Sequence, residues 1–135
     1  KTKIHRNTLP AYLYFLERAK IVSLLLPAGN SISTLQKPEK IYLSNTTLAY
    51  ALSSGNVEIG SIRETFFLSQ VKPFYGVKMP LNGDFLVNNQ YTFEIGGKSK
   101  TRKQVEGVAQ AYIVKDDIEY PVGGAIPLWM FGLLY

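Results

Sequence analysis

The chain has 135 residues, a formal charge of +5, 46% hydrophobic residues and 19% charged residues. This composition predicts one folded domain, or a domain plus a small appendage, with a real hydrophobic core. The chain has no cysteine and one histidine, His5. Disulfide scaffolds, thiol nucleophiles and sites built from thiolates or several histidines are therefore excluded. Carboxylates and lysines are left as the side chains that can carry chemistry.

No stretch approaches the roughly 18 apolar residues that a membrane span needs, and no signal peptide is visible. The longest apolar stretch, residues 126–135, is interrupted by Pro127 and Gly132. We expect no membrane partner and a cytoplasmic location, which suits a chain without cysteine. The chain opens at Lys1 without a methionine, and we expect it to be a piece of a longer polypeptide.

Residues 1–43 predict a helix followed by two short strands. Pro10 suits the first turn of a helix, and apolar residues then recur at helical spacing as far as Ala19. Residues 21–26 and 41–43 are short apolar runs typical of strands. A helix, a strand, a loop and a strand in this order resemble the last helix and the wing of a winged-helix domain.

Residues 44–135 alternate between helical and strand patterns. Ser44 or Asn45 can cap a short helix that ends at Leu52, and residues 57–71 predict a longer helix that ends before Pro73. The later segments predict strands over residues 74–79, 84–87, 91–95, 111–114 and, marginally, 118–120, with a helix over 102–109 and an apolar tail that packs last. This part of the chain is therefore expected to be an α/β domain.

Two of these strands place two carboxylates together. Strand side chains alternate between faces, and the apolar faces align when Phe85 pairs with Phe93. Residues 88–90 are then a three-residue loop. Asp84 lies directly opposite Glu94, with their Cβ atoms about 4.5–5.5 Å apart.

Opposed carboxylates repel each other unless a cation, a proton or a basic side chain lies between them. Mg²⁺ prefers such oxygen ligands, so one interpretation is a metal site that hydrolyses phosphodiesters. The alternative is an exposed polar face on which Lys98 or Lys78 neutralises the acids, because ion-pair networks produce the same pattern.

The positive charge is concentrated in two zones. Residues 1–43 hold seven basic and two acidic side chains, and residues 96–115 hold five basic and one acidic. Within the second zone, Lys98, Lys100, Arg102 and Lys103 lie at the start of the predicted helix, where they suit the phosphates of DNA or RNA. The alternative interpretation of these four residues is a solubilising loop.

Five short motifs occur in a fixed order along the chain, and their order is what carries a resemblance to a known family. They are KIYLSNTTL (40–48), IRETF (62–66), GDFLV (83–87), FEIGGKSK (93–100) and IPLWMFGLL (126–134). Over nearly its whole length the chain resembles the C-terminal domain of unknown function that follows the ATPase module in a family of bacterial and archaeal AAA-type ATPases. Residues 7–21 look like the winged-helix piece that joins the two modules.

The resemblance implies a restriction-endonuclease-like core over residues 44–135, built as a helix, three strands, a helix and a strand, after a winged-helix remnant over residues 1–43. Its PD-(D/E)XK signature implies that Asp84 and Glu94 hold Mg²⁺ and that Glu64 completes the metal set. It also places Gln104 at a polar position on the following helix.

Lys98 is the lysine that would complete the catalytic set with Asp84 and Glu94, but its spacing departs from the signature. It lies four residues after Glu94, where the signature has two. Four residues of strand span about 13 Å rather than about 7 Å, and a tight turn at Gly96 and Gly97 would be needed to shorten that path.

No GxxxxGK[ST] phosphate loop occurs in the chain. We therefore expect no ATP site here, and we expect the chain's first partner to be an ATPase module that precedes it. Three hypotheses follow. The offset of Lys98 favours a non-catalytic module that binds nucleic acid or a protein partner. The second hypothesis is a Mg²⁺-dependent nuclease using Asp84, Glu94 and Lys98, and the third is a structural or oligomerisation domain.

Overall fold

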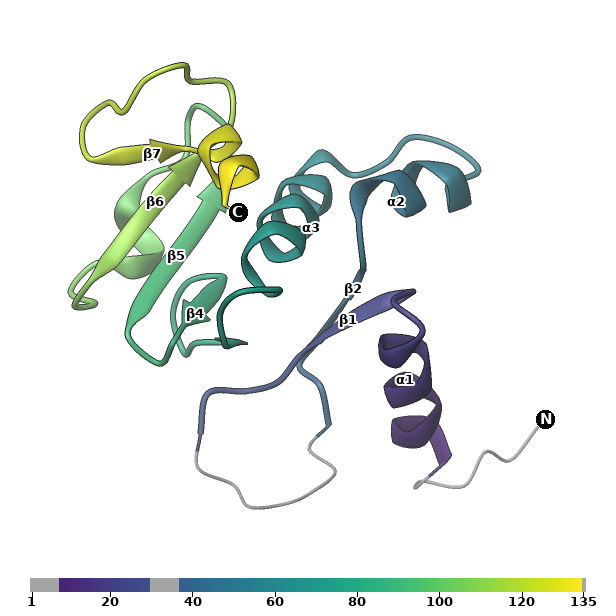
Figure 1. Ribbon diagram of the computed structural model, residues 1–135. Coiled ribbons are helices and arrows are strands. Elements are labelled where there is room, and N and C mark those ends of the chain that lie inside the picture. Colours follow the sequence, from purple (N-terminus) through teal and green to yellow (C-terminus); the bar gives the residue numbers. More distant parts are fainter. Residues whose placement is uncertain (1–7, 30–36, 135) are drawn as a thin grey trace.

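The computed structural model describes residues 8–29 and 37–134 (Figure 1). Its first part is the helix α1 (Thr8–Arg18) and an antiparallel hairpin of β1 (Val22–Leu25) and β2 (Lys40–Leu43). The predicted helix and two strands of this part are confirmed. His5 lies outside the described residues.

The second part is a mixed α/β structure. Its elements are, in chain order, α2 (Thr46–Leu52), α3 (Ile59–Val71), β3 (Val77–Lys78), β4 (Phe85–Val87), β5 (Tyr91–Gly96), η1 (Arg102–Val105), β6 (Ala111–Lys115), β7 (Ala125–Pro127) and η2 (Leu128–Leu133). The five strands form one sheet in the order β3-β4-β5-β6-β7. The pairs β3–β4 and β4–β5 are antiparallel, whereas β5–β6 and β6–β7 are parallel.

The two helices before the sheet begin at side-chain caps. Asn45 Oδ1 accepts a hydrogen bond from the Leu48 N–H at 2.9 Å, as expected for a cap of α2. Glu58 accepts from the N–H groups of Gly60 and Ser61 at 2.9 and 2.5 Å. These backbone hydrogen bonds hold the pKa of the Glu58 carboxyl below its usual range. Because Glu58 is the cap, α3 begins two residues after the predicted start.

The β4–β5 hairpin has the predicted register. Phe85 pairs with Phe93 and Val87 pairs with Tyr91, so the three-residue loop is confirmed. Asn88 and Asn89, the first two loop residues, have φ of 51° and 55°. Asparagine tolerates this left-handed conformation better than most residues.

Three other predictions were wrong in extent. The helix expected over 102–109 is a short 3₁₀ turn, because Gly107 adopts a φ of 75° that no right-handed helix allows. The strand expected over 74–79 is reduced to β3, because the N–H groups of Phe74 and Tyr75 still donate to Val71 O. Residues 118–120 form no strand, and the last strand is β7.

The sheet has a hydrophobic cluster on each face. On one face Phe67 of α3 lies with its ring centroid 5.1 Å from Phe85, 5.2 Å from Phe93 and 4.7 Å from Phe131 of η2. The cluster on the other face is smaller and is formed by Val105, Ala111, Ile113 and Ala125. Figure 1 shows α3 between the sheet and the β1–β2 hairpin.

The hairpin shares the larger cluster, to which Leu25 and Tyr42 contribute buried side chains. Lys72 Nζ, at the end of α3, lies 2.6 Å from Glu17 Oε1 and donates to Leu24 O at 2.9 Å. Contacts therefore cross the predicted boundary between residues 1–43 and 44–135, which itself stays a prediction. Among the described residues, no helix combines the length and the apolar character that crossing a membrane requires.

Candidate functional site

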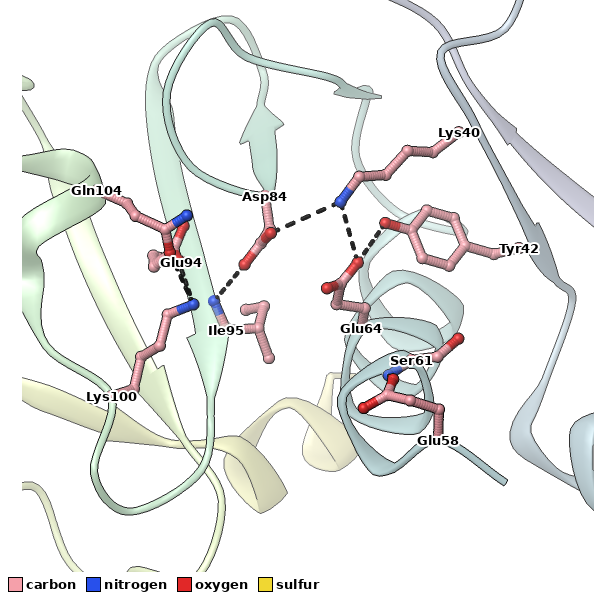
Figure 2. Close-up of polar contacts among 10 residues, drawn as sticks. All are labelled: Lys40, Tyr42, Glu58, Ser61, Glu64, Asp84, Glu94, Ile95, Lys100 and Gln104. Atoms are coloured by element: carbon pink, nitrogen blue, oxygen red, sulfur yellow. Dashed lines mark hydrogen bonds and ion pairs between the residues drawn. The ribbon is translucent and has the colours of Figure 1, made fainter. Parts of the chain in front are cut away.

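Asp84 directly precedes β4, and Glu94 lies on the neighbouring strand β5. In Figure 2 the Asp84 carboxylate is directed towards Lys40, whereas Glu94 is directed towards Lys100. The Asp84 N–H donates to Phe93 O at 2.9 Å. The Ile95 N–H in turn donates to Asp84 Oδ2 at 2.8 Å. This second hydrogen bond fixes the orientation of the Asp84 carboxylate against β5 and leaves its Oδ1 directed away from the strand.

Glu94 is the most buried charged side chain in the described part of the chain, with 1% of its surface exposed. The Lys100 ammonium forms an ion pair with its Oε1, and among the described residues Oε2 has no hydrogen-bond partner. Burial raises the pKa of Glu94, the contact with Lys100 opposes that rise, and the neighbouring Asp84 adds to it. An oxygen buried without a partner is costly in a purely structural role.

Lys100 reaches Glu94 through the space beside Gly96. A Cβ built on Gly96 would lie 2.5–2.8 Å from the Cδ, Cγ and Cβ atoms of Lys100. The loop turns back because the Lys100 N–H donates to Gly97 O at 3.0 Å. Gly96 lies two residues after Glu94, which is where the PD-(D/E)XK signature has its lysine. The stem of Lys100 therefore fills the volume that a lysine side chain at residue 96 would occupy.

Lys98, in contrast, is exposed, and its carbonyl oxygen accepts a hydrogen bond from Lys115 Nζ at 3.0 Å. No ion pair joins it to Asp84 or Glu94 within the described residues. The chain does turn tightly at Gly97, but the turn brings Lys100 rather than Lys98 to Glu94.

Two of the four predicted phosphate-binding cations have partners within the chain. Lys100 points inward to Glu94 and also donates to Gln104 Oε1 at 2.9 Å. The Arg102 guanidinium donates to the Ala111 carbonyl at 3.0 Å. Lys98 and Lys103 remain exposed.

Glu64, on α3, is held by two side chains of the β1–β2 hairpin. Its Oε2 accepts hydrogen bonds from Tyr42 Oη at 2.5 Å and from Lys40 Nζ at 3.2 Å. Lys40 Nζ also lies 3.7 Å from Asp84 Oδ1. Burial and the contact with Glu64 raise the pKa of the Tyr42 phenol above its usual range, so it stays a proton donor.

Sequence reasoning missed both Lys40 and Tyr42. They lie two residues apart on β2, so they share one face of the strand. That spacing was the available signal, and it occurs at the start of the motif KIYLSNTTL. No local pattern along the chain indicates that this face packs against α3.

Each of the three acids that are expected to hold magnesium has a lysine ammonium group close by. No three Asp, Glu, His or Cys residues gather as a metal-binding group in the part of the chain that the structure describes. Lys40 lies between Glu64 and Asp84, and the role of Glu64 as a third metal ligand stays a prediction. Mg²⁺ is usually held by one or two carboxylates and several waters, and the unpartnered Oε2 of Glu94 suits such a ligand.

The charges around this pair are nearly balanced. Burial raises the pKa of Asp84, the Ile95 N–H opposes that rise, and Glu64 adds to it. Three carboxylates face two ammonium groups, those of Lys40 and Lys100. The remaining negative charge favours a cation, and buried titratable groups perturbed in this way are typical of functional sites.

Comparisons of the chain with protein-family models, with curated proteins and with solved structures gave no match.

Proposed function

We propose that this chain is a nucleic-acid-processing module that accompanies the ATPase module of an AAA-type ATPase. In this proposal its core is restriction-endonuclease-like, and Asp84, Glu94 and Lys100 hydrolyse phosphodiester bonds with Mg²⁺. The order of α3, three antiparallel strands, a short helical turn and a parallel strand supports the fold. The second helix of such a core is reduced here to η1.

The position of Lys100 is the observation that carries the proposal. The spacing of Lys98 favoured binding over cleavage because it separated the lysine from the acids. Lys100 removes that objection, since its stem fills the space beside Gly96 and its ammonium group contacts Glu94. The contact of Lys100 with Glu94 supports a catalytic set in which the lysine comes six residues after Glu94 rather than two.

Each residue has a distinct role in this proposal. Asp84 and Glu94 hold the metal, and the Ile95 N–H keeps the Asp84 carboxylate in place. Bound Mg²⁺ supplies an activated water and neutralises charge on the phosphoryl group. The Lys100 ammonium stabilises the negative charge that develops on the phosphate, and Gln104 positions it by accepting its hydrogen bond.

Plasmid nicking with Mg²⁺ or Mn²⁺ tests this function. Lys100→Met and Lys98→Met each remove one positive charge from the same loop, so the second variant is a matched control. We expect Lys100→Met to lose about 10²–10³-fold in nicking rate, as is usual when one group that stabilises the transition state is removed. Lys98→Met should retain most of the activity, and Asp84→Asn should have none.

Equal losses in the two lysine variants would contradict the role of Lys100. Absence of nicking by the wild type at every metal concentration would contradict cleavage altogether. Binding without cleavage is the second candidate function, and the exposed Lys98 and Lys103 favour it. In that case the wild type should bind DNA with an affinity that falls as salt rises, because released counterions drive phosphate contacts.

A further inference from the structure

Lys40 is a cation that a different part of the chain inserts among the site's carboxylates. It belongs to β2, whereas Asp84 precedes β4 and Glu64 lies on α3. Its Nζ is 3.2 Å from Glu64 Oε2 and 3.7 Å from Asp84 Oδ1. Figure 2 shows the ammonium group between the two carboxylates, on the side of Asp84 that faces away from Glu94.

This ammonium group uses an oxygen that a metal ion at the Asp84–Glu94 pair needs. The Ile95 N–H donates to Asp84 Oδ2, whereas Oδ1 accepts no hydrogen bond within the described residues, so Oδ1 is the more open of the two oxygens. Lys40 is the cation near that oxygen. A divalent ion bound there would lie within a few ångströms of a like charge, and such repulsion is strong at short range in a partly buried site.

We propose, on the basis of the metal-dependent function proposed above, that Lys40 is a tethered cation that competes with Mg²⁺ for Asp84. The β1–β2 hairpin thereby sets the metal affinity of the site. When Lys40 is in place, the acids are neutralised from within the chain. When the metal binds, Lys40 must leave Asp84, and the hairpin loses one of its contacts with the rest of the molecule.

The competition at Lys40 affects the whole β1–β2 hairpin, because few polar contacts hold the hairpin to the site. Beside Lys40, the hairpin contacts the site through the hydrogen bond from Tyr42 to Glu64. Linkage is reciprocal. Lys40 weakens metal binding by a certain free energy, and a bound metal weakens the contact of β2 with Asp84 by the same free energy. A partner that moves the hairpin would have the same effect as removing Lys40.

The test measures Mn²⁺ binding directly, by calorimetry and by the electron paramagnetic resonance signal of the free ion. Lys40→Met removes the competing charge, and Lys37→Met is the matched control because Lys37 is an exposed lysine three residues earlier. We expect Lys40→Met to bind Mn²⁺ about five- to tenfold more tightly than the wild type, as the loss of one partly exposed ion pair allows. Lys37→Met and Lys40→Arg should bind as the wild type does.

Hydrogen exchange gives a readout independent of affinity. Added Mg²⁺ should speed exchange of the β2 amides in the wild type and leave it unchanged in Lys40→Met. Unchanged or weaker Mn²⁺ binding by a folded Lys40→Met protein would overturn the competition while leaving the metal site intact. If neither the wild type nor any variant binds Mn²⁺, the proposed function fails together with the competition, and Asp84→Asn then matches the wild type.

Discussion

Gly96 and Lys100 together bring one ammonium group to Glu94. Gly96, at the end of β5, leaves an open volume beside the strand, and the following loop supplies the Lys100 side chain that fills this volume. A glycine is required because any side chain on residue 96 would overlap the stem of Lys100, including its Cβ, which cannot move without the loop backbone. The identity of residue 96 therefore controls whether Glu94 has a partner.

Two substitutions at this position should have opposite results. Gly96→Ala displaces Lys100 and leaves Glu94 buried and unpaired, so we expect a loss of about 1–3 kcal/mol in the free energy of unfolding. The double variant Gly96→Lys with Lys100→Gly restores a lysine two residues after Glu94 and also removes the Cβ of residue 100, which would otherwise overlap the new side chain. Urea denaturation and the nicking assay should both place it closer to the wild type than Lys100→Gly alone. A double variant no better than Lys100→Gly would show that the loop, rather than the volume beside residue 96, is what matters.

At the scale of elements, the β4–β5 hairpin decides which side chains meet. Its three-residue loop sets the register that holds Asp84 against β5, and a slip of one residue would send each β4 side chain to the other face. Asn88 also ties the loop to the preceding segment, because its Oδ1 accepts the Gly76 N–H at 3.1 Å. The loop therefore contributes to the site without touching it.

The backbone of this loop can be tested at Asn89, an exposed residue with a φ of 55°. A β-branched side chain is strained in the left-handed region, so Asn89→Val should lower the free energy of unfolding by about 1–2 kcal/mol. Asn89→Gly should change it by less than about 0.5 kcal/mol, since glycine adopts this conformation freely. Gln90→Val is the control, because Gln90 is equally exposed and its φ is not positive. Similar losses for both valine variants in urea denaturation would contradict a backbone cause.

The hairpin also marks how far the sequence could predict this site. Its register followed from the alternation of apolar side chains along β4 and β5, which is a local rule. The choice of Lys100 over Lys98 was not local in the same sense, because it depends on how the turn at Gly97 directs the next three residues. The position of Lys40 was harder still to predict from the sequence, since it depends on the packing of the β1–β2 hairpin against α3.

At the scale of the whole molecule, the site collects side chains from four segments that lie far apart in the sequence. The β1–β2 hairpin contributes Lys40 and Tyr42, and α3 contributes Glu64. The β4–β5 hairpin contributes Asp84 and Glu94, and the loop between β5 and η1 contributes Lys100. The larger hydrophobic cluster joins the first three of these segments, since Tyr42, Phe67 and Phe85 all belong to it. Any change that loosens that cluster should therefore disperse the charges of the site.

Stability as a function of pH tests whether these charges are buried together. Burial raises the pKa values of Asp84 and Glu94 above the ordinary 3.8 and 4.5. The folded protein then binds more protons than the unfolded chain in the range above those values, so these groups make the free energy of unfolding fall as pH rises. Glu94→Gln removes one of them. The free energy of unfolding of Glu94→Gln, minus that of the wild type, should therefore increase as pH rises from about 4.5 towards neutrality.

Glu58 provides a control of the opposite sign within the same molecule. Hydrogen bonds from the N–H groups of Ser61 and Gly60 lower its pKa below 4.5. Its contribution to stability is present above pH 4.5 and is lost as pH falls through the lowered value. Relative to the wild type, Glu58→Gln should therefore lose stability as pH rises through that range, whereas Glu94→Gln gains it. Urea denaturation of the three proteins at a series of pH values measures both slopes, whatever constant offset each substitution adds. Parallel curves for Glu94→Gln and the wild type would mean that Glu94 titrates as an ordinary carboxylate, which would contradict a pKa raised by burial.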